Sequence, residues 1–394
     1  MSRAVVHHAP GVDCNVSIGG RTVTAMAEAV VDLDAIAHNC GLLAATAGPA
    51  GMMAVVKADG FGHGATEVAR TALRHGATWL GVTSVAEALA LRAEGLTAPM
   101  LLWLYPPTET FEEVLTAGID VSVGAVEALE VLADAADRTG TVANVHLKLD
   151  TGMSRGGAPA EEWAQLFTWA RKFESAGLLR VRALWSHLAN AENPQASGLL
   201  AQLREFDEAR QAAAAAGIDP PIVHLANSAA ALHLPQARFD LLRAGIGLYG
   251  IEPVPGRRFG LRPAMTVRAQ VLLTKRVPAG TGVSYGPDFV TDRETTLALV
   301  PLGFADGVPR HTSGRASFSI RGVRCPIAGR VSMDQVVLDV GDLPVRAGEW
   351  AVMFGPGDAG EPTVAEWARW ADTNPHEILT GIGHRVPRRY ESIR

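Results

Sequence analysis

Two hydrophobic patterns alternate over most of the chain. From about Val30 to Tyr249, short apolar or β-branched runs are separated by stretches rich in Ala, Leu and Glu with helical period. The short runs predict eight strands, at residues 53–56, 79–82, 100–104, 121–123, 144–149, 181–185, 222–225 and 240–242. Stretches such as 65–75 and 198–216 predict the helices between them. Eight strands alternating with helices favour an α/β fold, a closed (β/α)8 TIM barrel.

The pattern changes after Gly250. Gly- and Pro-rich turns then separate segments that predict strands at 266–277, 296–301, 316–320 and 336–340, and helical period returns only at 364–371. We therefore predict a barrel domain over 30–250 and a mostly β C-terminal domain over 251–394, joined by the Pro-Gly stretch 252–260. Residues 1–29 are expected to form an N-terminal segment that joins the β domain.

Composition narrows the class of protein. Of the 394 residues, 48 % are hydrophobic and 19 % charged, and the net charge is -6, which is typical of a globular enzyme and unfavourable for binding nucleic acid. No apolar run is long enough for a signal peptide or a membrane span, so we expect a cytoplasmic protein with no membrane partner. The cysteines Cys14, Cys40 and Cys325 lack metal-ligand spacing, which fits a reducing compartment and predicts no metal site.

Lys57 follows the first predicted barrel strand, within the segment AVVKADGFGHG (54–64). The C-terminal ends of barrel strands face the active site, and a partly desolvated lysine with a lowered pKa can bond covalently to an aldehyde cofactor. Taken alone, Lys57 is more simply interpreted as an ordinary solvent-facing lysine. Other motifs must therefore decide between the two interpretations.

The segment around Lys57 resembles the cofactor-lysine motif of alanine racemases. Eight further motifs follow in the order found in that family, across both predicted domains: HLKLDTGMSRGG (146–157), LWSHLANAE (184–192), HLANSAA (224–230), RAGIGLYG (243–250), VSYG (283–286), GFADG (303–307), GRVSMDQ (329–335) and RVPR (385–388). The resemblance implies an isomerase that uses pyridoxal 5'-phosphate (PLP) to interconvert L- and D-alanine, for D-alanine biosynthesis. It also implies a homodimer with shared active sites.

The resemblance implies two acid/base residues. Lys57 holds PLP and acts on one face of the substrate Cα, and Tyr285 acts on the other face from the partner subunit. Racemisation needs a group on each face, because a single base tends to return the proton to the face it left. By itself, Tyr285 is more simply read as a tyrosine packed in a turn.

Arg243 matches the family's arginine at the cofactor's pyridine nitrogen. A permanent cation there disfavours a protonated ring, which makes the ring a weaker electron sink and favours simple return of the proton. His187 resembles the histidine that links this arginine to the catalytic tyrosine, although by itself it reads as a core histidine.

Further site residues follow from the same resemblance. Asn227, Ser228, Gly245 and Ile246 match the phosphate-binding groups, and Asn227 with Ser228 also suits a helix N-terminus. Lys148 matches a lysine that is often carbamylated, and Arg155 one that contacts the cofactor and the substrate carboxylate. Met333 and the Asp334 amide match substrate-binding groups of the partner subunit. The substrate access corridor is matched by Glu192, Arg310, Arg330 and Ile382.

Three positions depart from the family pattern. Phe61 replaces a phosphate-binding tyrosine, His384 replaces a second tyrosine on the phosphate side, and Phe304 replaces a tyrosine near the gate. One lost hydrogen bond to a charged phosphate weakens cofactor binding by roughly 1.5–3 kcal/mol, and His384 is expected to compensate as a donor. A wider entrance would admit a different small amino acid, such as serine.

Two other classes of protein also have a PLP-binding barrel. A PLP-dependent decarboxylase is disfavoured because Arg243 suits proton transfer and because no cysteine lies in a proton-donor motif of the β domain. Cys325, in VRCPIAG, is expected to be buried in a strand. A single-barrel PLP carrier is disfavoured because the chain continues beyond the barrel and supplies Tyr285.

Overall fold

The computed structural model describes residues 15–18, 21–286 and 288–392, and the chain divides into two compact units. One unit consists of residues 36–60 and 65–261. The other consists of residues up to 35, residues 61–64 and residues from 262 onward. Cys14 and much of the N-terminal segment lie outside the described residues.

The first unit is a barrel of eight parallel strands, as predicted. In sheet order the strands are β10 (Ile222–His224), β9 (Leu179–Trp185), β8 (Ala143–Lys148), β7 (Asp120–Val123), β6 (Met100–Leu102), β5 (Trp79–Val82), β4 (Gly51–Val55) and β11 (Leu241–Ala244). The ring closes nearly completely, because the Asp240 amide donates to Val223 O at 3.0 Å and the Arg243 amide to Ala226 O at 3.0 Å. The strands are largely buried along their length, as expected for parallel strands covered by helices.

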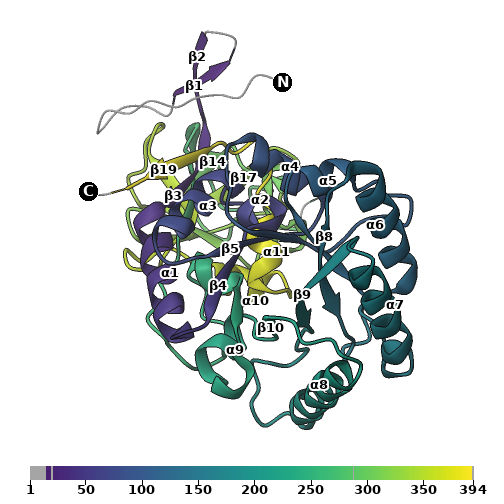
Figure 1. Ribbon diagram of the computed structural model, residues 1–394. Coiled ribbons are helices and arrows are strands. Elements are labelled where there is room, and N and C mark those ends of the chain that lie inside the picture. Colours follow the sequence, from purple (N-terminus) through teal and green to yellow (C-terminus); the bar gives the residue numbers. More distant parts are fainter. Residues whose placement is uncertain (1–14, 19–20, 287, 393–394) are drawn as a thin grey trace. The chain divides into compact units, whose positions relative to one another are not determined.

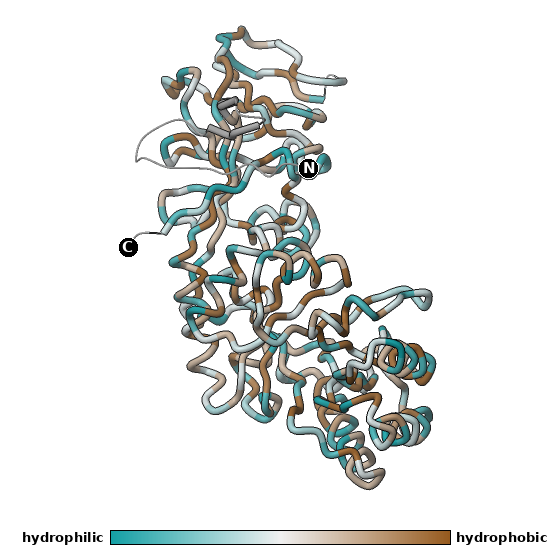
Figure 2. Tube along the Cα trace, turned by 45° about the horizontal axis from the view of Figure 1, so that its top comes forward, coloured by the Kyte–Doolittle hydropathy of each residue, from teal (hydrophilic) through white to brown (hydrophobic). Residues whose placement is uncertain are grey.

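Helices separate the strands. They are α1 (Leu33–Ala47), α2 (Lys57–Phe61), α3 (Ala65–Arg74), α4 (Val85–Ala93), α5 (Glu112–Thr116), α6 (Val126–Thr139), α7 (Trp163–Ser175), α8 (Ser197–Ala215) and α9 (Ser228–His233). Figure 1 shows α6, α7 and α8 on the outside of the barrel strands. Local sequence sets their ends: Ser84 and Glu87 form a capping box before α4, and Gly140 ends α6 with a φ of 65°. In Figure 2 hydrophobic and hydrophilic positions alternate along these helices, as amphipathic packing requires.

The second unit is mostly β, as predicted. A six-stranded sheet has the order β16 (Val323–Pro326), β15 (Ser317–Ile320), β18 (Trp350–Phe354), β12 (Met265–Gln270), β3 (Ala27–Asp32) and β19 (Arg388–Glu391). A three-stranded sheet has the order β13 (Leu273–Val277), β14 (Thr295–Val300) and β17 (Val336–Gly341), and β1 (Asn15–Ile18) pairs with β2 (Arg21–Thr24). Strand β3, which precedes the barrel in the sequence, lies between β12 and β19 in the larger sheet.

The single strand predicted at 266–277 is wrong, because this segment forms two strands in different sheets. The break lies at Val271 and Leu272. The Val271 amide donates to Glu349 O at 2.8 Å on the larger sheet, and the next amide, of Leu272, donates to Leu299 O at 2.8 Å on the smaller one. The chain thus passes from one sheet to the other within two residues.

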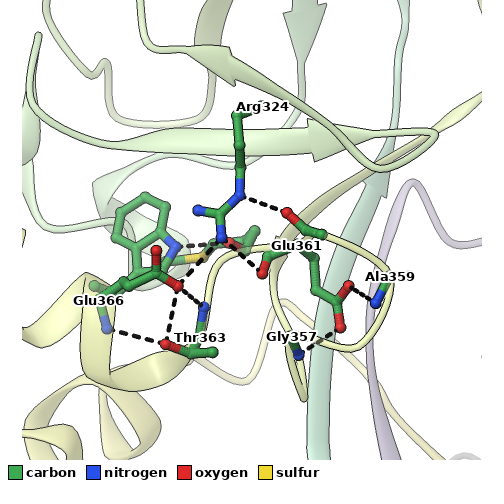
Figure 3. Close-up of polar contacts among 9 residues, drawn as sticks. Arg324, Gly357, Ala359, Glu361, Thr363 and Glu366 are labelled. Carbon is green, nitrogen blue, oxygen red and sulfur yellow. Dashed lines mark hydrogen bonds and ion pairs between the residues drawn. The ribbon is translucent and has the colours of Figure 1, made fainter.

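Two short helices complete this unit: α10 (Val364–Trp370) and α11 (Pro375–Thr380). Figure 3 shows the polar contacts before α10, where Arg324 donates to Glu361 O at 3.0 Å and pairs with Glu366 at 3.2 Å. Thr363 caps α10 by accepting from the Glu366 amide. Cys325 is buried in β16, as expected. Within the described ranges, no helix has both the length and the apolar character of a membrane span.

Candidate active site

Lys57 follows β4 at the C-terminal end of the barrel strands, and the backbone around it is held from several sides. The Tyr249 hydroxyl donates to Val55 O at 2.9 Å, and the Val56 amide donates to Gly81 O at 2.9 Å. The Gly60 amide then donates back to Val56 O at 2.8 Å. These bonds fix the point from which the Lys57 side chain leaves the strand.

The chain after Lys57, labelled α2 in Figure 1, is a left-handed turn rather than a right-handed helix. Ala58, Asp59, Gly60 and Phe61 have φ angles of 52°, 51°, 61° and 52°, a region that side chains other than glycine rarely occupy. Glu87 supports this turn from α4, because its carboxylate accepts from the Ala58 amide at 2.6 Å. Strained backbone of this kind is often found at functional sites.

The Lys57 amine lies in a positive environment and is half-buried. Burial lowers the pKa of Lys57 below its usual range, the nearby Arg155 lowers it further, and Glu87 opposes the shift. A lysine with a lowered pKa has a larger fraction of free amine near neutral pH, and the free amine is the form that attacks a carbonyl carbon.

Arg243 lies on β11 and is 5 % exposed. Its Nη1 donates to His224 Nδ1 at 3.0 Å, and its Nη2 lies 2.9 Å from Ser186 O, 3.0 Å from Leu225 O and 3.1 Å from His187 Nδ1. Burial lowers the pKa of Arg243 to about 9, so the guanidinium remains charged at neutral pH. Several bonds thus hold one buried cation in a fixed orientation.

His187 and Lys148 are affected by this cation. Burial and then Arg243 lower the pKa of His187 to about 3, so the ring is neutral, and because its Nδ1 accepts from Arg243 its proton lies on Nε2. Burial, followed by Arg155 and Arg243, lowers the pKa of Lys148 to about 8. Lys148 Nζ lies 4.9 Å from the centre of the Trp185 ring. The structure therefore gathers several positive groups in one barrel.

The residues expected to hold phosphate converge in a tight turn. Ser228 Oγ accepts from the Gly245 amide at 2.9 Å and from the Gly247 amide at 3.2 Å. Asn227 caps α9, its side chain accepting from the Ala230 amide at 3.1 Å. A Cβ at Gly247 would approach the Ser228 Cβ to 3.3 Å, a tight contact that would push Ser228 away from the turn. This cradle of small residues, with amide and hydroxyl groups, fits a phosphate ester.

Arg155 is exposed and Ile246 buried in the barrel unit, whereas Tyr285, Met333 and Asp334 lie in the β unit. Tyr285 is 71 % exposed and follows Ser284, whose φ is 64° and whose hydroxyl donates to Arg330 O at 2.7 Å. Met333 is 55 % exposed. Asp334 pairs with Arg385 at 2.7 Å. The side chains of Tyr285 and Met333 are thus presented on the surface of this unit.

The three substituted positions also lie in the β unit. Phe61 is buried, with its ring centre 5.8 Å from that of His376. Phe304 and His384 are exposed. Among the corridor residues, Glu192 and Arg310 are exposed, Arg330 pairs with Asp288, and Ile382 is buried.

Sequence reasoning did not find three buried polar residues of the barrel: Asp120, His146 and His224. His224 contacts Arg243 directly. One signal was available, since His146 and Lys148 are two residues apart in HLKLD and therefore share one face of a strand. Glu87, which supports the turn after Lys57, was also not identified.

Comparisons with known proteins agree on one family. The family described as Alanine racemase, N-terminal domain, matches residues 31–253, and Alanine racemase, C-terminal domain, matches residues 264–390. A protein of Thermobifida fusca named alanine racemase is 51 % identical over 369 residues, which are 93 % of this chain and 99 % of the relative.

Solved structures give the same result. The alanine racemase from D-cycloserine-producing Streptomyces lavendulae superposes with a TM-score of 0.92 at 44 % identity, over 94 % of this chain and 98 % of the other. The structure of the Bartonella henselae enzyme, 31 % identical with a TM-score of 0.85, contains covalently bound pyridoxal phosphate and is matched over 93 % of this chain and 100 % of the other.

Proposed function

The chain belongs to the alanine racemase family, and we propose that it interconverts L- and D-alanine by a two-base mechanism with PLP bound to Lys57. The observation that carries the proposal is the arrangement around the barrel strand ends. A lysine of lowered pKa, a fixed buried arginine and a turn of small residues with amide and hydroxyl groups all belong to this one unit. PLP, when bound, supplies an electron sink that makes the substrate Cα more acidic.

The barrel residues fit PLP in their chemistry. Ser228, with the amides of Gly245 and Ile246 and with Asn227, would hold the phosphate, and Arg243 would face the ring nitrogen. The buried Arg243 cation would disfavour a second positive charge beside it, and so would disfavour protonation of the ring nitrogen. A weaker electron sink favours return of the proton over side reactions. We assign cofactor binding also to His187, Arg155 and His384.

Two bases would act on the substrate. Lys57 Nζ accepts or donates the proton on one face, and the Tyr285 hydroxyl does so on the other. We propose that the tyrosine comes from a second copy of the chain in a homodimer, which agrees with its exposure of 71 %. Arg155 would bind the substrate carboxylate, together with Met333 and the Asp334 amide of the second copy.

Two further assignments follow. Lys148 is proposed as a carbamylated lysine, because its pKa of about 8 leaves free amine to react with carbon dioxide. The product anion would offset the positive charges of Arg155 and Arg243.

We expect the protein to work in a reducing compartment, the cytoplasm, since Cys40 and Cys325 are buried free thiols.

The test measures the product made from L-alanine. Chiral chromatography should show D-alanine, and carbon dioxide release should be absent. A Lys57→Ala variant should lose conversion, whereas Lys172→Ala, at a lysine that lies over the Trp169 ring on α7, should retain it. Release of carbon dioxide would favour a decarboxylase, and full conversion by the Lys57 variant would overturn the assignment.

The departures at Phe61, Phe304 and His384 favour a second candidate, racemisation of another small amino acid such as serine. Phe304 is 41 % exposed and carries no hydroxyl, so a gate built with it would be less polar than one built with tyrosine. Comparing the turnover of L-alanine with that of L-serine decides between them. A preference for alanine by orders of magnitude would remove this candidate.

A further inference from the structure

A chain of hydrogen-bonded side chains crosses the barrel. Asp120 Oδ2 lies 3.1 Å from His146 Nε2, His146 Nδ1 lies 2.9 Å from His224 Nε2, and His224 Nδ1 lies 3.0 Å from Arg243 Nη1. The four residues come from β7, β8, β10 and β11, and none is more than 5 % exposed. Strands β8 and β10 are not neighbours in the sheet, so their side chains meet inside the barrel.

Aromatic rings enclose the two histidines. The Trp79 ring lies edge-on to His146, with centres 5.4 Å apart, and the Trp185 ring stacks on His224 at 5.2 Å with an interplanar angle of 16°. Such packing fixes the planes of both imidazole rings and keeps water away from them. The histidines therefore depend on one another, on Asp120 and on Arg243 for hydrogen bonds.

A second arginine lies at the far end of the chain. Arg182 Nη1 is 3.3 Å from Asp120 Oδ2, and its guanidinium lies 4.8 Å from the centre of the Trp79 ring. The Arg182 guanidinium can only donate, so Asp120 Oδ2 serves as an acceptor at this end of the chain.

These contacts determine where each proton lies. The Arg243 guanidinium can only donate, so His224 Nδ1 accepts and the His224 proton is on Nε2. That proton points at His146 Nδ1, so the His146 proton is on Nε2 and points at Asp120. Burial lowers the pKa of both histidines, so each ring carries one proton. In this chain of side chains, the N–H groups of Arg243, His224 and His146 therefore all point in the direction from Arg243 to Asp120.

We propose that Asp120 is a positioning residue that, through His146 and His224, fixes Arg243 as a donor in one orientation. Reversing the order of protons would place His224 Nδ1–H against an Arg243 N–H, and two facing donors leave both without a partner. The guanidinium would then have to move. The expected effect on catalysis rests on the proposed role of Arg243 at the cofactor ring. The order of the protons does not depend on that role.

The experiment uses full-length protein with bound PLP and three variants. Asp120→Leu has nearly the same shape and removes the acceptor, whereas Asp120→Asn keeps an acceptor oxygen and removes the charge. Thr71→Val is the matched control, since Thr71 is equally buried in the same unit, on α3, and its hydroxyl accepts from Arg74 at 3.3 Å. Nitrogen-15 NMR of the histidine rings reports which nitrogen carries the proton.

In the unaltered protein and in Thr71→Val, His146 and His224 should both be neutral with the proton on Nε2. Asp120→Leu should place the His224 proton on Nδ1 in part of the molecules and lower kcat roughly tenfold, with KM within about twofold. Asp120→Asn should retain the Nε2 proton but move the His146 and His224 Nε2–H resonances upfield, since a neutral acceptor forms a weaker bond.

Two results would overturn the proposal. One is a proton on Nδ1, or a charged ring, at either histidine in the unaltered protein. The other is an Asp120→Leu variant whose His224 keeps the Nε2 proton and whose kcat equals that of Thr71→Val. If Asp120→Leu does not fold, an unchanged His224 resonance in Asp120→Asn overturns the proposal. An unaltered protein with the expected protons but no racemisation would instead contradict the proposed function.

Discussion

Arg243 Nη2 donates to His187 Nδ1 across 3.1 Å, and Arg243 is buried whereas His187 is half-buried. The bond determines two properties at once. It assigns the His187 proton to Nε2, on the side away from the arginine, and it adds a third acceptor to the two carbonyl oxygens around Arg243 Nη2.

The first prediction concerns the geometry of this cation. Arg243→Lys keeps the positive charge, but one ammonium group cannot reach His224, His187 and the two carbonyl oxygens that the guanidinium contacts. We expect a loss of ~2–3 kcal/mol in the free energy of unfolding and a kcat lower by about a factor of 100. Chemical denaturation and steady-state kinetics measure both, and an unaltered kcat would show that a positive charge alone suffices.

The second prediction concerns pH. The pKa of His187 is about 3 in the folded chain, below its ordinary value of 6.5, so between these values the unfolded chain binds more protons. His187 therefore makes the folded state less stable as pH falls through this window. Replacing His187 with Gln should flatten the dependence of unfolding free energy on pH there, by at most ~1.4 kcal/mol per pH unit. Urea denaturation at several pH values tests this, and an equal slope in both proteins would refute it.

The third prediction concerns the phosphate cradle. Ser228→Ala leaves the Gly245 and Gly247 amides without the hydroxyl that accepts from both, and it removes a hydroxyl that we propose as a donor to the phosphate. PLP should bind about tenfold more weakly, as measured by equilibrium titration. The free energy of unfolding should fall by ~1–2 kcal/mol. Ser197→Ala, at an exposed residue of α8, serves as the control and should behave like the unaltered protein. Equal PLP affinities for the two variants would place the phosphate elsewhere.

Much of the fold could be predicted from the sequence because the barrel strands are continuous apolar runs. The strand ending at Val55 is almost entirely buried, and such a run differs clearly from the amphipathic helices around it. The break at Val271 could not be predicted, because the segment 265–277 contains neither Gly nor Pro to mark a change of sheet. The left-handed turn from Ala58 to Phe61 also had no signal, since most of its residues are not glycine.

The site could be predicted only in part. Lys57, Ser228 and Arg243 lie in motifs that imply their roles. His146 and His224 also begin motifs, but they are 78 positions apart and only the barrel brings their side chains together. A buried polar chain of this kind depends on tertiary contacts, which periodicity does not report.

The fourth prediction concerns Phe61, which is buried and lacks the hydroxyl found at this position in the family pattern. Phe61→Tyr should strengthen PLP binding by a factor of ten to about one hundred, because a hydrogen bond to a charged phosphate is worth roughly 1.5–3 kcal/mol. Equilibrium titration with PLP measures the change. Weaker binding would mean that the new hydroxyl is buried without a partner.

The identity of the lysine that bonds to the cofactor tests the account most directly. Two lysines have a lowered pKa, Lys57 and Lys148. Protein with bound PLP should absorb near ~420 nm, the general colour of a Schiff base of this cofactor, and borohydride should bleach the band. Peptide mapping of the reduced protein should then find the label on Lys57. A label on Lys148, or no labelled lysine, would contradict the account.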